Sequence, residues 1–213
     1  MKKFFCAIMM AMFVTGAFAQ DDDKQNVIVA YVGPQFSMAT IGGGGFSTGA
    51  KFSFLGGLQY ERNAVFGDDF GLYGGLEYSA KGVKDFMFLD GHMDNYNLNY
   101  LQLNLGAKYS KEIWGIDGFG EVGPYLAYGI GGESEWGIFG YKCDSFGDFD
   151  FGKCLGFKKF DFGFRIAVGA EFSGFRIMAG YQQGLINVAD KKLISNGYKN
   201  YGFYAAVGYG FKF

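Results

Sequence analysis

The sequence contains little charge and no excess of basic residues. Charged residues make up 19% of its 213 residues, below the roughly 25% of ordinary soluble domains. The formal net charge is −2, so the chain lacks the basic surface with which proteins bind nucleic acid. We therefore expect no nucleic-acid partner.

Histidine is nearly absent, which narrows the catalytic chemistry that the chain could support. His92 is the only histidine, and Asp90 and Asp94 lie near it. No serine partner for His92 can be identified, so we expect a solvated loop residue. We predict that the protein is not an enzyme and needs no cofactor or metal. A lipid-modifying enzyme that uses His92 at the outer rim is the least favoured alternative.

Beyond residue 19, the sequence has no apolar run long enough to cross a membrane as a helix, which takes about 20 residues. The N-terminal segment is also too short for that. Two lysines precede its apolar run Phe4–Val14, and it ends in Ala17-Phe18-Ala19. These are the parts of a secretory signal peptide, so we expect cleavage between Ala19 and Gln20.

Aromatic side chains, in contrast, are abundant: they make up 20% of the chain, with 26 Phe and 15 Tyr. An exported protein with so much aromatic surface needs an apolar environment. Inside a bilayer every backbone N–H and C=O must be paired, and without helices only a closed β-barrel achieves this. The composition therefore favours a barrel in the outer membrane of a two-membraned bacterium, surrounded by outer-membrane lipid.

Alternation of apolar and polar residues locates the strands. Between Asp69 and Lys81 the even positions are mostly apolar and the odd positions mostly polar or small, as expected for lipid-facing and interior residues. The same alternation marks residues 51–61, 100–109, 160–172 and 203–213, and more weakly 27–38, 119–130 and 175–188. The eight segments predict an all-β fold, an eight-stranded antiparallel transmembrane up-and-down β-barrel. The expected organisation is a signal peptide at 1–19, an acidic tether at 20–26 and the barrel at 27–213.

The connections between these segments predict a register and an orientation. A two-residue turn at Ser173-Gly174 pairs Phe172 with Phe175, and both are predicted to face outward. If the N-terminus is periplasmic, the periplasmic turns are short and the outer loops longer, as is typical of outer-membrane barrels. The turns are then Arg62–Asp68, Lys111–Asp117 and Ser173-Gly174, and the loops are 39–50, 82–95, 131–158 and 189–197.

Several charged residues fall at inward-facing positions. Eight strands leave an interior that side chains just fill, and buried charges must be paired. We expect a salt-bridged plug, with Glu77 and Arg165 near mid-height. A narrow polar channel is the alternative, because many interior positions are glycine, although glycine also allows tight closure. The expected cluster comprises Glu61, Asp69, Glu77, Lys108, Glu121, Arg165, Glu171, Arg176 and Lys212.

The loop at 131–158 is the longest and carries both cysteines of the mature chain. We expect Cys143 and Cys154 to form a disulfide, because the protein is exported; free thiols or a metal pair are the alternatives. The loop is also rich in exposed aromatic residues, and loops on a rigid scaffold often carry recognition. It is either a binding surface for an unknown extracellular ligand or a pair of strands above the membrane. Its aromatic residues are Trp136, Phe139, Tyr141, Phe146, Phe149 and Phe151.

Five short motifs stand in order along the chain: Leu76–Gly82, Asn99–Leu103, Phe160–Gly163, Tyr181–Asn187 and Gly208–Phe213. Together they resemble the PorT-like group of outer-membrane β-barrel proteins over essentially the whole mature chain, although Asn104 stands where that group has proline. The resemblance implies an outer-membrane barrel but no defined activity. It also implies that the barrel-assembly machinery recognises the C-terminal aromatic residues Tyr209, Phe211 and Phe213.

The predicted function is a structural role or a surface interaction through the outer loops. The protein is expected to be a monomer with a filled interior and to meet the barrel-assembly machinery during biogenesis. The alternative from a different class is a small passive channel for ions or solutes. Electrical conductance of the folded barrel would favour the channel.

Overall fold

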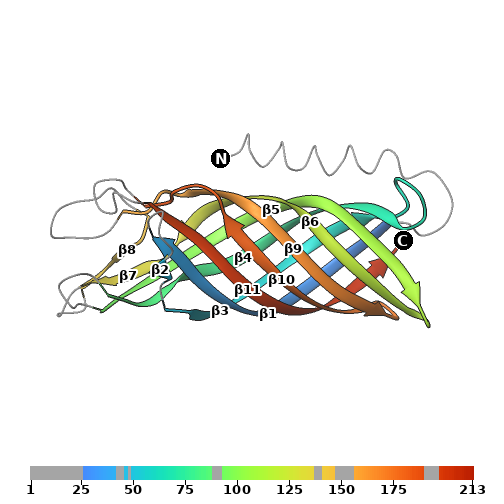
Figure 1. The fold of residues 1–213 in the computed structure, drawn as a ribbon, viewed down its shortest axis with the longest axis horizontal. Coiled ribbons are helices and arrows are strands. Elements are labelled where there is room, and N and C mark those ends of the chain that lie inside the picture. The colour runs from blue at the N-terminus through green and yellow to red at the C-terminus, as the bar shows by residue number, and fades with distance from the viewer. Residues whose placement is uncertain are drawn as a thin grey trace.

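A computed structural model describes residues 26–41, 46–47, 49–87, 93–136, 141–146, 156–189 and 197–213. Eight long strands run up and down along one axis (Figure 1). They are β1 (Asn26–Ile41), β3 (Lys51–Arg62), β4 (Phe70–Met87), β5 (Met93–Ile113), β6 (Ile116–Gly131), β9 (Phe160–Phe172), β10 (Phe175–Gly184) and β11 (Tyr198–Lys212). Three short strands are β2 (Phe46–Ser47), β7 (Glu133–Trp136) and β8 (Tyr141–Asp144). No helix within the described ranges is long and apolar enough to cross a membrane.

The long strands close into a barrel in which every neighbouring pair is antiparallel. Their order is β4-β3-β1-β11-β10-β9-β6-β5, and pairing of β4 with β5 completes the circle. The first and last strands pair from Val27↔Lys212 to Ile41↔Tyr198. Closure leaves no long strand with an open edge, which is how barrels avoid unpaired backbone groups. The predicted eight-stranded barrel is confirmed.

The two faces of each strand differ as the alternation predicts. Outward-facing Val168 is 66% exposed and Leu58 is 59% exposed, whereas inward-facing Glu77 and Arg165 are 0% exposed. Apolar side chains therefore cover the outside, and polar side chains are enclosed. This inside-out distribution suits a protein surrounded by lipid.

One end of the barrel, here called the short-turn end, holds both ends of the described chain and three short connections. Ser173 (φ 50) and Gly174 (φ 84) form a two-residue turn, and Phe172 pairs with Phe175 as predicted. The predicted turn Lys111–Asp117 is wrong in length, because only two residues separate the last pair, Ile113↔Ile116. Isoleucine favours strands, and these two residues prolong β5 and β6.

The opposite end, the long-loop end, carries structure that sequence patterns did not resolve. Strands β4 and β5 continue pairing to Met87↔Met93, with an irregularity between Val83 and Phe86, so the predicted loop 82–95 is shorter. The predicted loop 131–158 contains a hairpin of β7 and β8. β7 also pairs with β5 through Tyr96↔Ser134.

An apolar cluster lies inside the barrel at the long-loop end. Phe157 packs edge-on against Tyr96 (5.3 Å between ring centroids) and Tyr198 (5.1 Å), while Phe146 packs against Tyr100 (5.3 Å). All five rings are buried. The prediction that Phe146 is exposed is therefore wrong, because the chain after β8 turns inward and places this ring over Gly129.

Candidate functional site: the charged interior

Aromatic rings and glycines share the interior in cross-strand pairs. Tyr73 pairs with Gly106 in β5, Phe119 with Gly169 in β9, and Tyr204 with Gly180 in β10. A Cβ atom at these glycines would lie 2.4–2.7 Å from atoms of the facing ring. The glycines therefore make room for rings that fill the interior, and they do not leave it open.

The middle layer of the interior is built on Arg165 of β9. Its Nη1 lies 2.9 Å from Oε2 of Glu77 in β4, and both side chains are completely buried. Its Nε donates to the Tyr204 hydroxyl (2.6 Å), and Nη1 also donates to the Tyr31 hydroxyl (3.2 Å). Tyr31 in turn donates to Glu77 (2.8 Å). The guanidinium is thus held by side chains from three other strands, β1, β4 and β11.

Amide side chains extend this middle layer across the barrel. Gln182 donates to Oε1 of Glu77 (3.0 Å), and Gln102 donates to Gln182 (3.3 Å) and to Asn104 (2.7 Å). All four of these side chains are buried. Both carboxylate oxygens of Glu77 are therefore occupied, as a charge out of contact with water requires.

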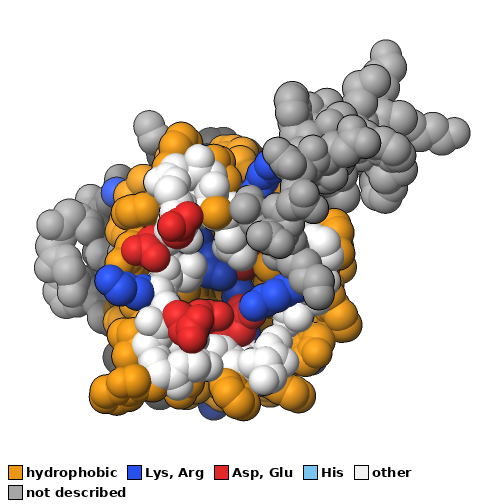
Figure 2. All heavy atoms as spheres, turned by 90° about the vertical axis from the view of Figure 1, so that its right-hand side faces the viewer, with side chains coloured by type: hydrophobic (Ala, Val, Ile, Leu, Met, Phe, Trp, Pro, Cys, Tyr) orange, Lys and Arg blue, Asp and Glu red, His pale blue; other side chains and the backbone are white. Residues whose placement is uncertain are grey.

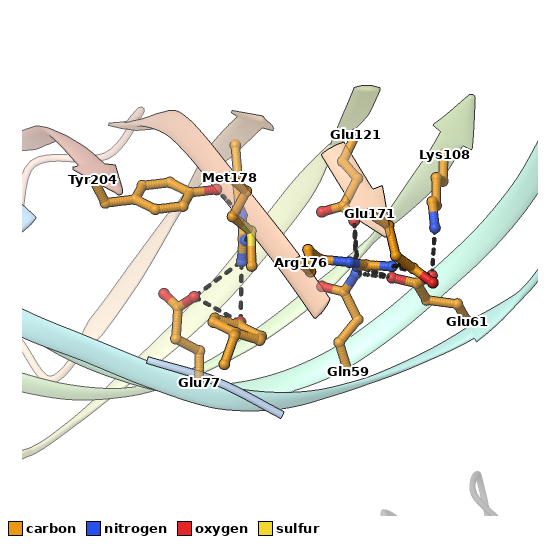
Figure 3. Close-up of polar contacts among 11 residues, drawn as sticks. Gln59, Glu61, Glu77, Lys108, Glu121, Glu171, Arg176, Met178 and Tyr204 are labelled. Atoms are coloured by element: carbon orange, nitrogen blue, oxygen red, sulfur yellow. Dashed lines mark hydrogen bonds and ion pairs between the residues drawn. The ribbon is translucent and has the colours of Figure 1, made fainter. Parts of the chain in front are cut away.

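A second layer nearer the short-turn end surrounds Arg176 of β10 (Figure 3). Glu61 binds its guanidinium through both carboxylate oxygens, with Nη2 2.9 Å from Oε2. Nη2 is also 2.8 Å from Glu171, and Nη1 is 3.4 Å from Glu121. Lys108 lies 2.6 Å from Glu61, so that carboxylate is shared by two cations.

The surroundings of Arg176 complete this layer. Gln59 donates 2.8 Å hydrogen bonds to both Glu61 and Glu121. The Arg176 guanidinium lies over the ring of Phe119 at 4.5 Å from its centroid. Contact with the face of an aromatic ring is favourable for a cation. Seen from the short-turn end, acidic and basic side chains gather at the centre within a rim of apolar ones (Figure 2).

A third layer lies toward the long-loop end and was missed by sequence reasoning. Lys81 of β4 is 3.5 Å from Asp161 of β9, and both are buried. The Lys81 ammonium sits over the Tyr125 ring at 4.1 Å, and Tyr125 donates to Asp161 (3.3 Å). Lys81 and Asp161 occupy inward positions of the alternating pattern, and this position is the signal that could have identified them.

Together the three layers fill much of the interior of the barrel. Four cations and five carboxylates are buried among the described residues, and each takes part in at least one ion pair. A cavity beside Lys81, Tyr125 and Asn200 measures about 10 Å³, room for about one water molecule. Within the described part of the chain, no group of three or more His, Cys, Asp or Glu side chains could hold a metal ion.

Two members of the predicted cluster are not buried in the interior. Asp69 is in the connection before β4, and its carboxylate accepts a 3.5 Å hydrogen bond from Tyr109, whose side chain faces outward. Lys212 sits at the rim with its side chain 47% exposed, 3.6 Å from Glu171. The remaining seven are buried and ion-paired, namely Glu61, Glu77, Lys108, Glu121, Arg165, Glu171 and Arg176.

The other predicted sites are described only in part. Cys143, Trp136 and Tyr141 belong to the β7–β8 hairpin, where Trp136 pairs with Tyr141. At the C-terminus, outward-facing Tyr209 packs against Phe211 at 4.8 Å, and Phe213 is exposed. Several predicted residues lie outside the described ranges: Ala19, Gln20, His92, Phe139, Phe149, Phe151 and Cys154.

The chain is similar to several solved structures. OprG from Pseudomonas aeruginosa shares 11% identity, with a TM-score of 0.51 over 90% of this chain and 100% of OprG. Ail, the attachment invasion locus protein of Yersinia pestis, shares 14% identity (TM-score 0.46; 88% of this chain, 99% of Ail). Neisserial surface protein A shares 12% (TM-score 0.45; 87% and 97%). At this identity the likeness to OprG indicates the fold alone.

The family of this chain is evident from its sequence. Curated protein sequences give no match. The outer membrane protein β-barrel domain family matches residues 4–211, which is nearly the whole chain and includes all eight long strands. The bacterial outer membrane is therefore where this barrel resides. The chain belongs to the outer membrane protein β-barrel domain family.

Proposed function

We propose that this protein is a barrel with a filled interior and without enzymatic activity, whose role is a surface interaction. The long-loop end makes this interaction, and we take it as the outer end because outer-membrane barrels usually carry their longer loops outside the cell. The observation that carries the proposal is the filled interior. Arg165 and Arg176 are held at two heights by carboxylates from other strands, and an apolar cluster around Phe157 lies beyond them at the outer end. A barrel filled in this way is suited to be a scaffold.

The β7–β8 hairpin is the outer structure best suited to contact a partner. Its strand β7 pairs with β5 of the barrel. At its surface, the Lys142 ammonium lies 3.3 Å from the Glu135 carboxylate, and the two side chains are 63% and 42% exposed. Loops and hairpins held by a rigid scaffold commonly carry binding. We assign the unknown extracellular ligand to this hairpin, with the protein acting as a monomer.

Membership of the PorT-like group is part of the same proposal. What supports it is that the resembling motifs meet in the interior. Glu77 of Leu76–Gly82 accepts a hydrogen bond from Gln182 of Tyr181–Asn187. Lys81 of the first motif pairs with Asp161 of Phe160–Gly163. Residues of these motifs therefore contact one another in one packed interior. Such contacts are expected if the motifs are the residues that the members of the group share.

Surface presentation can be tested with a membrane-impermeant maleimide on intact cells. In a chain with Cys143 and Cys154 replaced by serine, we introduce Lys142→Cys on β8 and, as the matched control, Phe66→Cys in the β3–β4 turn. Phe66 is 73% exposed at the short-turn end. Lys142→Cys should react on intact cells, and Phe66→Cys only after the outer membrane is permeabilised. The reverse pattern would show that the hairpin faces the periplasm and would refute the proposal.

A further inference from the structure

The wall between β3 and β4 is paired over only part of its length. Backbone pairing of these two strands ends at Leu55↔Ser79, although both strands continue toward the long-loop end. Beyond that point β3 pairs with β1, on its other side. Within the described residues, pairing of β4 on this side returns at one bridge, which joins Lys84 to the connection before β3. We call the unpaired stretch, residues 51–54 of β3 and 80–83 of β4, the β3–β4 seam.

Side chains of β1 take the place of the missing backbone ladder. Because β3 lies between β1 and β4, the buried Gln35 side chain must cross the inner face of β3 to donate to the Ala80 carbonyl (2.7 Å). The same amide accepts a hydrogen bond from the Ser79 hydroxyl (3.0 Å). The Gly82 N–H donates to the Ser37 hydroxyl (3.0 Å). The polar backbone groups of β4 at the seam are thus held by side chains and not by β3.

These contacts are easier to release than a backbone ladder. At the upper end of the seam, the half-buried Lys51 ammonium donates to the Lys81 carbonyl (3.2 Å). A released glutamine or lysine side chain regains rotamer freedom, which favours opening. Packing on the β3 side is also incomplete, because the buried Ser53 hydroxyl has no hydrogen-bond partner among the described residues. The seam is therefore a weak line in an otherwise paired wall.

The seam borders the cavity in the third ionic layer. Gln35 and Ser37, which hold β4, also line this cavity, together with Lys81, Gln182 and Asn200. Its lining is thus rich in hydrogen-bonding groups. At the long-loop end the apolar cluster covers the interior along the barrel axis, so a route through the seam avoids the aromatic rings.

We propose that the β3–β4 seam is a lateral gate through which water and small polar solutes reach the cavity beside Lys81. Opening requires that Gln35, Ser37 and Lys51 release β4, while the β1–β3 and β4–β5 ladders stay intact. The polar lining disfavours apolar chains, which cannot satisfy these groups. The ionic layers around Arg165 and Arg176 lie below the cavity, so the gate leads into the interior and not across the membrane.

Thiol reactivity tests the gate directly. In a chain with Cys143 and Cys154 replaced by serine, Ser53→Cys places a thiol on β3 at the seam, where the native side chain is 8% exposed. Ala127→Cys is the matched control: Ala127 is 2% exposed, faces Asp161 of the same layer, and is paired on both sides. With 2-hydroxyethyl methanethiosulfonate and the folded barrel in vesicles, Ser53→Cys should react roughly tenfold faster, as local opening allows. Equal rates would overturn the proposal, because entry along the barrel axis would serve both positions alike.

A second pair of variants tests the side chains that hold the seam. Adding Gln35→Leu to the Ser53→Cys chain should raise its reaction rate several-fold, because the hydrogen bond to Ala80 is lost. Lys51→Met, a milder change at a half-buried position, should act in the same direction. Neither change should alter the rate at Ala127→Cys. An unchanged rate at Ser53→Cys in both variants, with heat-modifiable gel mobility showing folded barrels, would refute the gate.

Discussion

Arg165 and Arg176 lie at two heights inside the barrel, and each binds carboxylates that are themselves fully buried. Such a pair contributes little to stability compared with apolar packing, but removing one partner leaves an uncompensated charge. The alternation of residues predicted that these side chains point inward. It could not predict which partners meet, because Arg176 and Glu61 are 115 residues apart.

Removal of one arginine tests this account of the interior. Arg165→Met leaves Glu77 buried without its cation, so the free energy of unfolding should fall by about 3–5 kcal/mol, measured by urea titration in vesicles. Lys142→Met, which breaks the exposed pair with Glu135, should change it by less than about 1 kcal/mol. Equal small effects for both would contradict a tightly packed ionic interior.

The glycines inside the barrel give a second test at this scale. Gly169→Ala should lower the free energy of unfolding by about 1–3 kcal/mol, because its Cβ would lie 2.4 Å from the Phe119 ring. Gly120→Ala is the control, since the first atom that its Cβ meets is 3.9 Å away. An unchanged urea midpoint for Gly169→Ala would mean that the ring does not fill this space.

At the scale of elements, the period-2 pattern predicted the eight long strands well, because lipid outside and polar packing inside constrain alternate residues. It was less accurate near the ends of strands. The turn at Trp114-Gly115 lacks the usual residues of a two-residue turn, so the hairpin was predicted too short. The β7–β8 hairpin lies in the predicted loop 131–158, outside the segments with an alternating pattern. The sequence therefore left two interpretations of this loop, a binding surface or a pair of strands above the membrane.

The expected disulfide would tie β8 to the segment that follows it. Cys143 lies on β8, and closing a loop of this size stabilises by about 3 kcal/mol in the chain-entropy model. In protein extracted without reductant, we expect neither cysteine to react with maleimide until dithiothreitol is added. Reaction of two thiols in the untreated, urea-unfolded protein would show that the disulfide does not exist.

At the scale of the whole molecule, closure brings together residues that no local pattern connects. The β1–β11 register sets how the strands are staggered, and this stagger decides which inward residues share a layer. Three ionic layers and an outer apolar cluster result. The mature chain could therefore be assigned from its sequence to an outer-membrane barrel with a filled interior, but the partners of each ion pair became evident only from the structure.

The filled interior should not conduct ions. Recording the electrical conductance of the mature protein in a planar lipid bilayer tests this most directly. Heat-modifiable mobility on a gel first establishes that the protein is folded. We predict no stable conductance from the wild-type barrel, because charged and aromatic side chains occupy its interior. Stable conductance steps that change on Glu77→Gln would contradict this account and would make the protein a small passive channel.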